Sequence, residues 1–183
     1  MTDIHTGQLL LAEPFMPESH FKRSAILICD HNAAGSVGFV LNKQLDVNVD
    51  DLIEDFPEFP YPIYYGGPVQ QDTIHYIHRM GDLVGDCQEV VNGIYWGGDY
   101  DKIKFLISQG LITNKDIRFF VGYAGWTGGQ IAKELDYGSW VVANMYANYL
   151  FKTPPNDLWQ QAMENKGNIY SVIAQVPDNS VLN

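Results

Sequence analysis

The chain has 183 residues, of which 46% are hydrophobic, 13% aromatic and 18% charged, a composition typical of a globular protein rather than a disordered or fibrous one. Eleven Lys and Arg against 22 Asp and Glu give a formal net charge of -11, which opposes direct binding to nucleic-acid phosphates and to anionic membranes. This length favours a single domain over residues 1–183, with a core large enough to need neither a metal nor a disulfide.

The first half of the chain predicts mostly strands. The second of them is apolar on successive residues, as in a strand that is covered on both faces. A short acidic helix is expected at Asp50–Phe56 and ends before Pro57, and the turn at residues 66–68 separates two later strands. The expected strands are Gln8–Glu13, Ser24–Cys29, Val37–Asn42, Tyr61–Tyr65, Thr73–Arg79 and Val90–Trp96.

The second half predicts both helices and strands. Tyr100–Gln109 places apolar residues on one helical face, with Asp99 as N-cap and Gly110 after the last turn. Trp140–Ala143 is either a short strand or the start of a helical stretch that runs to Leu150. The other expected elements are a strand at Ile117–Tyr123, helices at Gly128–Asp136 and Asn156–Asn165, and a last strand at Tyr170–Val176. Because strands outnumber helices and the early ones are consecutive, the pattern favours an α+β domain with a mixed sheet.

The start of the chain and its cysteines indicate a cytoplasmic protein. The first residues lack the basic and apolar regions of a signal peptide, and the longest apolar runs are far below the ~20 residues that a membrane span needs. Two cysteines, Cys29 and Cys87, do not make a disulfide framework. Cys29 closes an apolar run, which is typical of a buried thiol.

The glycine-rich passage from Phe120 to Gln130 predicts a ligand-binding loop between a strand and a helix. Free N–H groups at a helix start suit an anion, although the G-x-x-G-x-x-G-G spacing matches neither the dinucleotide motif nor the P-loop. The alternative is structural, because Thr127 and Gln130 have the spacing of a capping box with Thr127 as N-cap. Glu134 is not needed for such a cap, which makes it the more interesting acid.

Three other polar patterns each have a structural and a functional interpretation. His31 lies just past an expected strand end and is a candidate acid or base, although a turn explains its polar neighbours equally well. The sequence positions of His75 and His78 differ by an odd number within one expected strand, so their side chains point to opposite faces of the sheet. We expect His78 to be a hydrogen-bonded histidine of the core. The acidic run at residues 46–58 has no Lys or Arg and is a solvated face or a surface for a basic partner.

Four ordered blocks of residues then form a recognisable pattern. They are Phe21-Lys22-Arg23-Ser24 with Asp30-His31-Asn32, Gly35, Gly38 and Asn42; Gly66-Gly67-Pro68 with His78; Gly122-Tyr123-Ala124 with Trp126, Gly129-Gln130, Glu134-Leu135 and Trp140; and Leu150-Phe151-Lys152-Thr153-Pro154 with Trp159. This pattern resembles the AlgH/YqgE family of bacterial proteins over about residues 7–176. The resemblance implies a single-domain α+β fold, with a mixed sheet bent into a partial barrel and helices packed around it. The regulatory label of this family implies an effect on transcription, but not a demonstrated contact with DNA.

These observations favour a non-enzymatic regulatory or binding protein that acts through a protein partner or a small ligand, with any effect on transcription being indirect. The alternative is an enzyme on a small polar or anionic metabolite, with His31 or Glu134 as acid or base and the amides of residues 128–130 holding an anionic group. We expect no metal, no other cofactor, no nucleic acid and no membrane as partners. The residues expected to bind a ligand are Ser24, Asn42, Gly66, Gly67, His78, Trp126 and Gln130.

Overall fold

The computed structural model describes residues 3–178, which form ten strands and seven helices. The strands are β1 (Gln8–Ala12), β2 (Ala25–Asn32), β3 (Gly35–Val40), β4 (Gln44–Asn48), β5 (Pro62–Tyr65), β6 (Val69–His78), β7 (Gln88–Val91), β8 (Ile94–Trp96), β9 (Ile117–Thr127) and β10 (Trp140–Asn144). The helices are α1 (Val49–Leu52), α2 (Gly81–Val84), α3 (Tyr100–Ser108), α4 (Gln130–Asp136), α5 (Ala147–Phe151), α6 (Pro155–Lys166) and α7 (Ile169–Ala174).

The strands form one strongly curled sheet. Eight of them follow the order β10-β1-β2-β3-β9-β6-β8-β7, and each neighbouring pair along this path is antiparallel. β5 adds a parallel pairing to β9, and β4 pairs with β5, so the sheet is mixed. The predicted single-domain α+β fold, with a mixed sheet bent into a partial barrel, is therefore confirmed.

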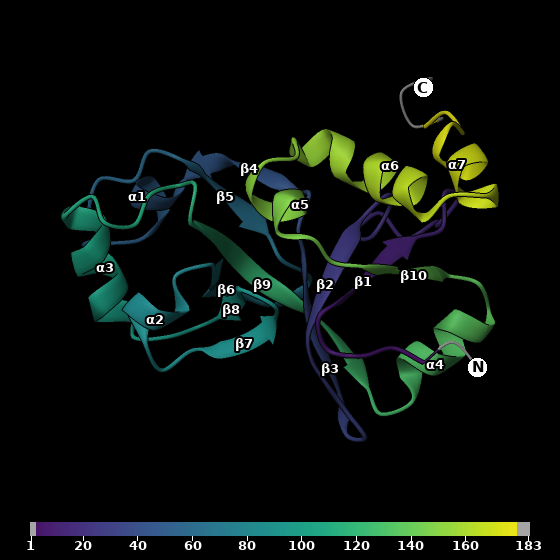
Figure 1. Ribbon diagram of the computed structural model, residues 1–183, viewed down its shortest axis with the longest axis horizontal. Helices are drawn as coiled ribbons and strands as arrows, with labels where there is room; N and C mark the ends of the chain where they lie inside the picture. Colours follow the sequence, from purple (N-terminus) through teal and green to yellow (C-terminus); the bar gives the residue numbers. More distant parts are fainter. Residues whose placement is uncertain (1–2, 179–183) are drawn as a thin grey trace.

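The long strand β9 joins two sections of this sheet. Its second half pairs with β3 in the first section, which also contains β10, β1 and β2, whereas its first half pairs with β5 and β6 in the second section (Figure 1). The bend falls at Gly122, whose φ of +66° favours glycine. Gly66 closes tightly against this bend, since a Cβ there would lie 2.3 Å from the Gly122 carbonyl oxygen.

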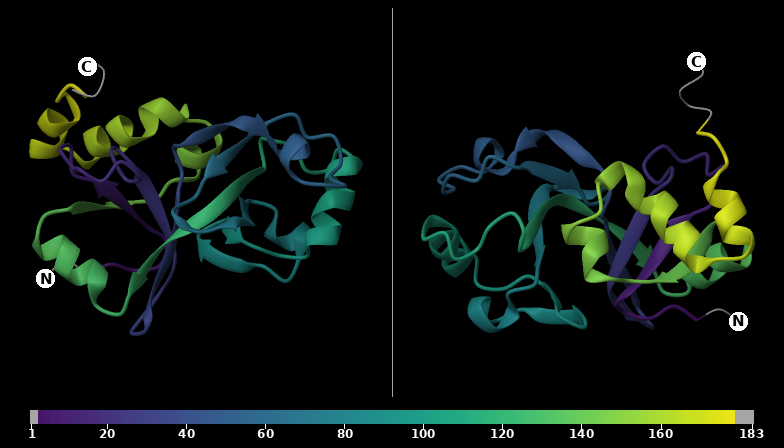
Figure 2. Two further views of the ribbon diagram at one scale, coloured as in Figure 1. Left: turned by 180° about the vertical axis from the view of Figure 1, so that it is seen from behind. Right: turned by 45° about the horizontal axis from the view of Figure 1, so that its top comes forward.

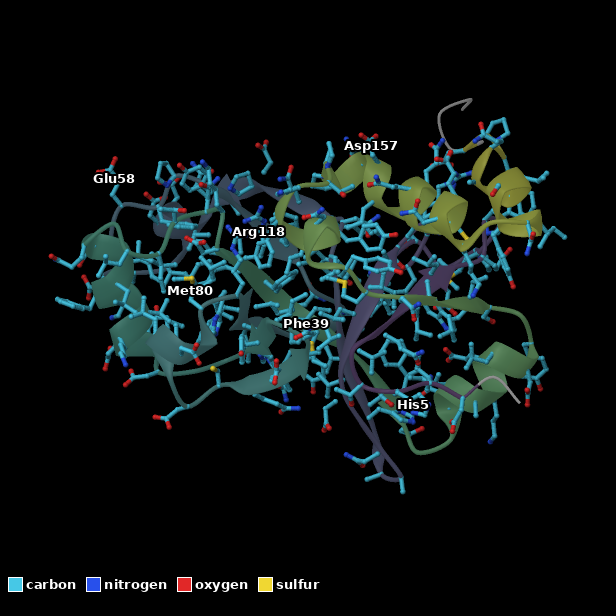
Figure 3. The ribbon with its side chains drawn as sticks, in the orientation of Figure 1. His5, Phe39, Glu58, Met80, Arg118 and Asp157 are labelled. Atoms are coloured by element: carbon cyan, nitrogen blue, oxygen red, sulfur yellow. The ribbon has the colours of Figure 1, made fainter. Side chains whose placement is uncertain are left out.

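The main hydrophobic core fills the hollow of the curled sheet. It combines apolar side chains from both sections with those of α5 and α6, and Phe39 lies near the middle, 5.5 Å from the Phe120 ring (Figure 3). Helices α6 and α7 cover one side of β1 and β2, and α4 lies on the opposite side (Figure 2). A third cluster packs α3 against the outer face of the second section.

Several predicted elements differ from those observed. The strand predicted at Tyr170–Val176 is wrong, because this segment folds as the helix α7, which packs on α6. The expected strand Val90–Trp96 is also wrong: it is the hairpin β7–β8, which turns at Gly93 with φ +76°. The acidic helix is only α1, and β4 had no expected counterpart. The N-cap at Asp99 is confirmed, since its carboxylate accepts from the Lys102 N–H.

Candidate functional site

Residues near the glycine-rich passage and near His31 come together around one open depression of about 460 Å³. It lies between the hairpin β2–β3, the second half of β9 and the start of α4. We call this feature the hairpin depression. Its polar lining comes from Asp30, Asn32, Ser36, Tyr123, Thr127 and Gln130.

Strand pairing explains why these distant segments meet. In the β2–β3 hairpin His31 stands opposite Ser36, and in the next pair Ser36 stands opposite Trp126 of β9. His31 Nδ1 lies 2.6 Å from the Ser36 hydroxyl oxygen, a hydrogen-bonding distance. The expectation that His31 follows the strand is wrong, because β2 continues through a bulge and includes it.

The carboxylate of Glu134 is occupied by three hydrogen bonds. The indole N–H groups of Trp126 and Trp140 donate to one oxygen at 2.9 and 2.7 Å, and the Gln130 amide donates to the other at 2.8 Å. Both indoles are buried, and their rings meet edge to face at 6.2 Å. Glu134 therefore fastens α4 to β9 and β10 rather than pointing an unpaired carboxylate into the depression.

Half of the predicted capping box is present. The Gln130 side-chain oxygen accepts from the Thr127 backbone N–H at 3.0 Å, as a residue at the third helical position does in such a box. Thr127 as N-cap is wrong, however, since Gly129 with φ +77° precedes the helix and makes no side-chain cap. Gln130 thus links the end of β9 to Glu134 through the two ends of its amide.

Two predicted ligand residues hold the backbone together away from the depression. The Asn42 side chain accepts from the Ala25 N–H at 3.0 Å and donates to the Arg23 carbonyl at 2.9 Å. Ser24 is fully buried and donates its hydroxyl to the Phe21 carbonyl at 2.7 Å. These contacts give both residues a structural role, and their part in ligand binding stays a prediction.

The glycine pair contacts the strand that lines the depression. A Cβ on Gly67 would come within 2.2 Å of the carbonyl oxygen of Tyr123, so only glycine lets the two backbones approach this closely. Tyr123 in turn lines the depression. Gly66 and Gly67 therefore shape the wall of the depression from behind.

His78 lies elsewhere, in the core of the second section. It is fully buried, lies 2.8 Å from the Gly97 carbonyl through Nε2, and accepts from the Met80 N–H through Nδ1. Burial lowers the pKa of His78, and the Gly97 carbonyl opposes this only in part. The expectation of a hydrogen-bonded core histidine is confirmed. Within residues 3–178, no three His, Cys, Asp or Glu side chains gather in a way that could hold a metal ion.

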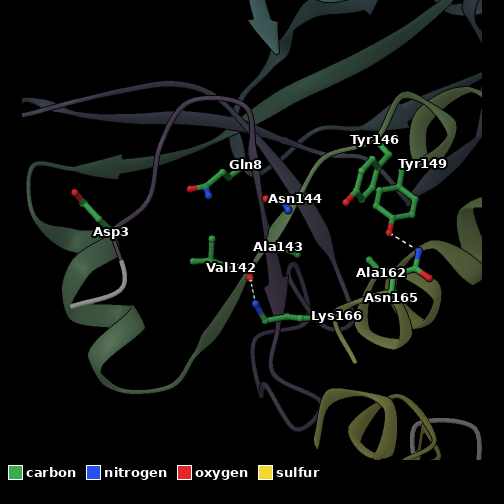
Figure 4. Close-up of a pocket in the computed structure, with 10 residues that line it drawn as sticks. All are labelled: Asp3, Gln8, Val142, Ala143, Asn144, Tyr146, Tyr149, Ala162, Asn165 and Lys166. Carbon is green, nitrogen blue, oxygen red and sulfur yellow. Dashed lines mark hydrogen bonds between the residues drawn. The ribbon is translucent and has the colours of Figure 1, made fainter. Parts of the chain in front are cut away.

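The sequence reasoning did not find Ser36 and Tyr123 as site residues, nor a second cavity of about 410 Å³. That cavity lies beside β10 and α6 (Figure 4). There the Lys166 amine donates to the Val142 carbonyl, and the Asn165 amide donates to the Tyr149 hydroxyl. Ser36 could have been found from the turn that precedes Gly35, because the position of a hairpin turn sets the register of its strands and so places Ser36 opposite His31.

The fold and site define an α+β half-barrel protein with a polar depression where a β-hairpin meets a long kinked strand. In the part of the chain that the structure describes, no helix has the length and apolar character to cross a bilayer. A model of the family described as AlgH-like matches residues 9–171, and this chain belongs to that family.

Relatives and solved structures support this assignment. The UPF0301 protein of Chlorobaculum parvum is 41% identical over 175 residues, covering 96% of this chain and 94% of that protein. The UPF0301 protein of Bacteroides thetaiotaomicron is 38% identical over 178 residues, covering 97% and 90%. The crystal structure of protein DIP2367 from Corynebacterium diphtheriae is similar with a TM-score of 0.79 and 26% identity, over 96% of this chain and 94% of that one. The solution structure of AlgH from Pseudomonas aeruginosa is similar with a TM-score of 0.74 and 27% identity, over 97% and 99%.

Proposed function

We propose that this protein is a non-enzymatic binding protein with a regulatory role, and that it takes a small polar ligand or a partner segment at the hairpin depression. The observation that carries the proposal is that both carboxylate oxygens of Glu134 are hydrogen-bonded, by Trp126, Trp140 and Gln130. A general acid or base must reach the proton that it moves, whereas these groups are used to fix the shape of a preformed surface.

The lining of the depression supports recognition of a polar molecule. Asn32, Ser36, Tyr123 and Thr127 carry neutral donors and acceptors, and Asp30 carries the carboxylate among the lining residues. A site with a few placed polar groups on a rigid frame fits a small ligand, and the volume of about 460 Å³ falls in the usual range for one. The net charge of -11 supports an indirect effect on transcription, through such a ligand or through another protein.

Thermal unfolding in a panel of metabolites and nucleotides tests this proposal. A ligand at 100 times its dissociation constant adds about 2.7 kcal/mol, a rise of roughly 5–10 °C for a domain of this size. We expect the rise to disappear in Thr127→Val and Asp30→Asn and to persist in the matched control Thr153→Val, which lies outside the depression. A rise that survives in both depression variants would contradict the proposed location.

One contact favours a second candidate function, an enzyme that uses His31 as its acid or base. The distance of 2.6 Å between His31 Nδ1 and the Ser36 oxygen brings a base to a hydroxyl at the edge of the depression. Turnover of small anionic metabolites followed by proton NMR separates the two functions. Turnover by the natural chain that is lost in a folded His31→Ala variant would support the enzyme.

A further inference from the structure

A second surface lies at the other end of the molecule, where two adjoining cavities form one groove. The larger, of about 500 Å³, runs between the loop 57–61 and the turn 107–114, and the smaller, of about 170 Å³, continues it toward β4 and β5. The two cavities share Phe59, Tyr61 and Asn114. We call this feature the end groove. Figure 3 labels Glu58, one of its lining residues, near the end of the molecule opposite α7.

The end groove is lined in part by apolar side chains, of which Pro60 and Tyr61 are exposed. Ile107 and Ile112 are almost fully buried, and two prolines with Phe59 and Tyr61 form the opposite wall. Tyr61 keeps 40% of its surface exposed, enough to receive another side chain on its ring. Aromatic-lined grooves suit an extended segment of a partner protein.

Both walls of the groove are held in place by the fold itself. The Asp50 carboxylate accepts from the Phe59 N–H at 2.8 Å, and the Phe59 ring packs edge to face on Phe119 at 5.6 Å. On the other wall the Asp116 carboxylate accepts from both the N–H and the hydroxyl of Thr113. A partner therefore finds a preformed surface and loses little free energy in ordering it.

The chain segment that leads into the loop 57–61 carries an excess of negative charge, and its last acid, Glu58, lines the groove. The segment 46–58 holds six of the 22 acidic residues of the chain and no Lys or Arg. Five of the six are exposed, and among the described residues none of these five makes an ion pair; they are Asp46, Asp51, Glu54, Asp55 and Glu58.

Two cations lie on the side of the turn 107–114, and one of them, Arg118, lines the smaller cavity. The Arg118 guanidinium donates to the carbonyls of Asn114 and Ile117, and it lies over the Phe151 ring at 5.6 Å. Lys115 is exposed at the far end of the turn, next to Asn114. Acidic side chains therefore gather on the side of the loop 57–61, and basic side chains on the side of the turn 107–114.

From this charge and shape we infer that the end groove binds an extended, basic segment of a partner protein. An Arg or Lys of the partner stacks on the Tyr61 ring and pairs with Glu58, while an apolar side chain enters between Pro60 and Ile112. A second copy of this chain is a poor occupant, because both copies carry a net charge of -11. The inference goes beyond the proposed function and does not depend on it.

Selection of short random peptides displayed on phage, with the full chain as target, tests the inference. We expect enriched peptides to be basic with at least one apolar residue. Their fluorescein-labelled forms should bind with dissociation constants that rise about tenfold or more in Tyr61→Ala and in Glu58→Lys. The matched control Glu18→Lys makes the same charge change at an exposed site in another part of the chain and should change affinity less than about twofold.

The selection can also overturn the inference. Failure to enrich basic peptides, or affinities that neither groove variant weakens, would refute it. Amide chemical shifts of the labelled chain separate the two surfaces, since a peptide at the end groove perturbs residues 57–61 and 107–114. Perturbations confined to residues 123–130 would refute the groove and favour the hairpin depression instead. Unfolding temperatures within about 2 °C of the natural chain show that the exposed positions were changed without loss of the fold.

Discussion

The hydrogen-bond network of Glu134 predicts a large loss of stability on its removal. Glu134→Ala takes away the acceptor for two buried indole N–H groups and for the Gln130 amide. A hydrogen bond to a charged group contributes about 1.5–3 kcal/mol, and a buried donor left without a partner costs about 1–3 kcal/mol. Because the three bonds share one carboxylate and Glu134 is only half-buried, these values do not add, and we expect a total loss of about 3 kcal/mol.

Equilibrium unfolding in urea measures this loss of free energy, followed by the fluorescence of the four tryptophans, which include Trp126 and Trp140. Thermal unfolding gives a second measure. At roughly 2–4 °C per kcal/mol the unfolding temperature should fall by about 6–12 °C. Glu134→Gln keeps one oxygen acceptor but turns the other oxygen into an N–H donor that faces the Gln130 amide. We therefore expect about half of the loss of unfolding free energy that Glu134→Ala causes. The matched control Glu18→Ala removes an exposed carboxylate and should stay within about 0.5 kcal/mol of the natural chain. A Glu134→Ala variant as stable as this control would refute the structural role given to the carboxylate.

Three further predictions concern pH, packing and the end of the described chain. Burial lowers the pKa of His78, so as the pH falls below about 6.5 this histidine is protonated in the unfolded chain before it is protonated in the folded one. The free energy of unfolding should therefore fall with pH in this range, and fall less in His78→Gln. Measuring the unfolding free energy as a function of pH in both proteins tests this. Gly66→Ala forces a Cβ against a backbone oxygen and should cost more than about 2 kcal/mol, whereas Gly125→Ala meets only a movable side chain at 3.3 Å; equal unfolding temperatures would contradict this. The Arg23 guanidinium lies 4.6 Å from the Trp159 ring and donates to the Val176 carbonyl, so Arg23→Ala should speed amide hydrogen exchange in α7 relative to α3.

Much of the fold could be predicted because its periodic patterns are local. The apolar run in β2 and the capped helix α3 need only their own residues to be recognised. The segment of α7 shows the limit, since six residues with mixed apolar spacing fit a strand or a helix equally well. Packing on α6 decides between them, and no short window of sequence contains that contact.

The site was harder to predict because it depends on register between distant strands. The residues His31 and Gln130 could each be singled out, but only the pairing of β3 with β9 brings their surroundings to one depression. Buried polar residues cause the opposite error, because residues with a structural role are predicted as site residues. Ser24 and Asn42 stand out in the sequence as polar groups beside apolar strands, yet their side chains bond backbone groups. Asn42 pairs with the Ala25 N–H and the Arg23 carbonyl. The Ser24 hydroxyl adds a second bond to the Phe21 carbonyl, which also accepts from the Ser24 N–H.

The strand β9 connects the two proposed surfaces and also explains why they should act independently. Its second half lines the hairpin depression, and its first residues line the end groove. Energetic coupling between two sites needs an element with two arrangements that both sites bias. β9 pairs with β6 along one edge and with β5 and then β3 along the other, and Gly66 closes against its bend at Gly122. Between the two surfaces, residues 120 and 121 of β9 are paired on both edges and the bend that follows is packed against Gly66. This part of the strand offers one arrangement, so occupation of the depression should leave affinity at the groove unchanged.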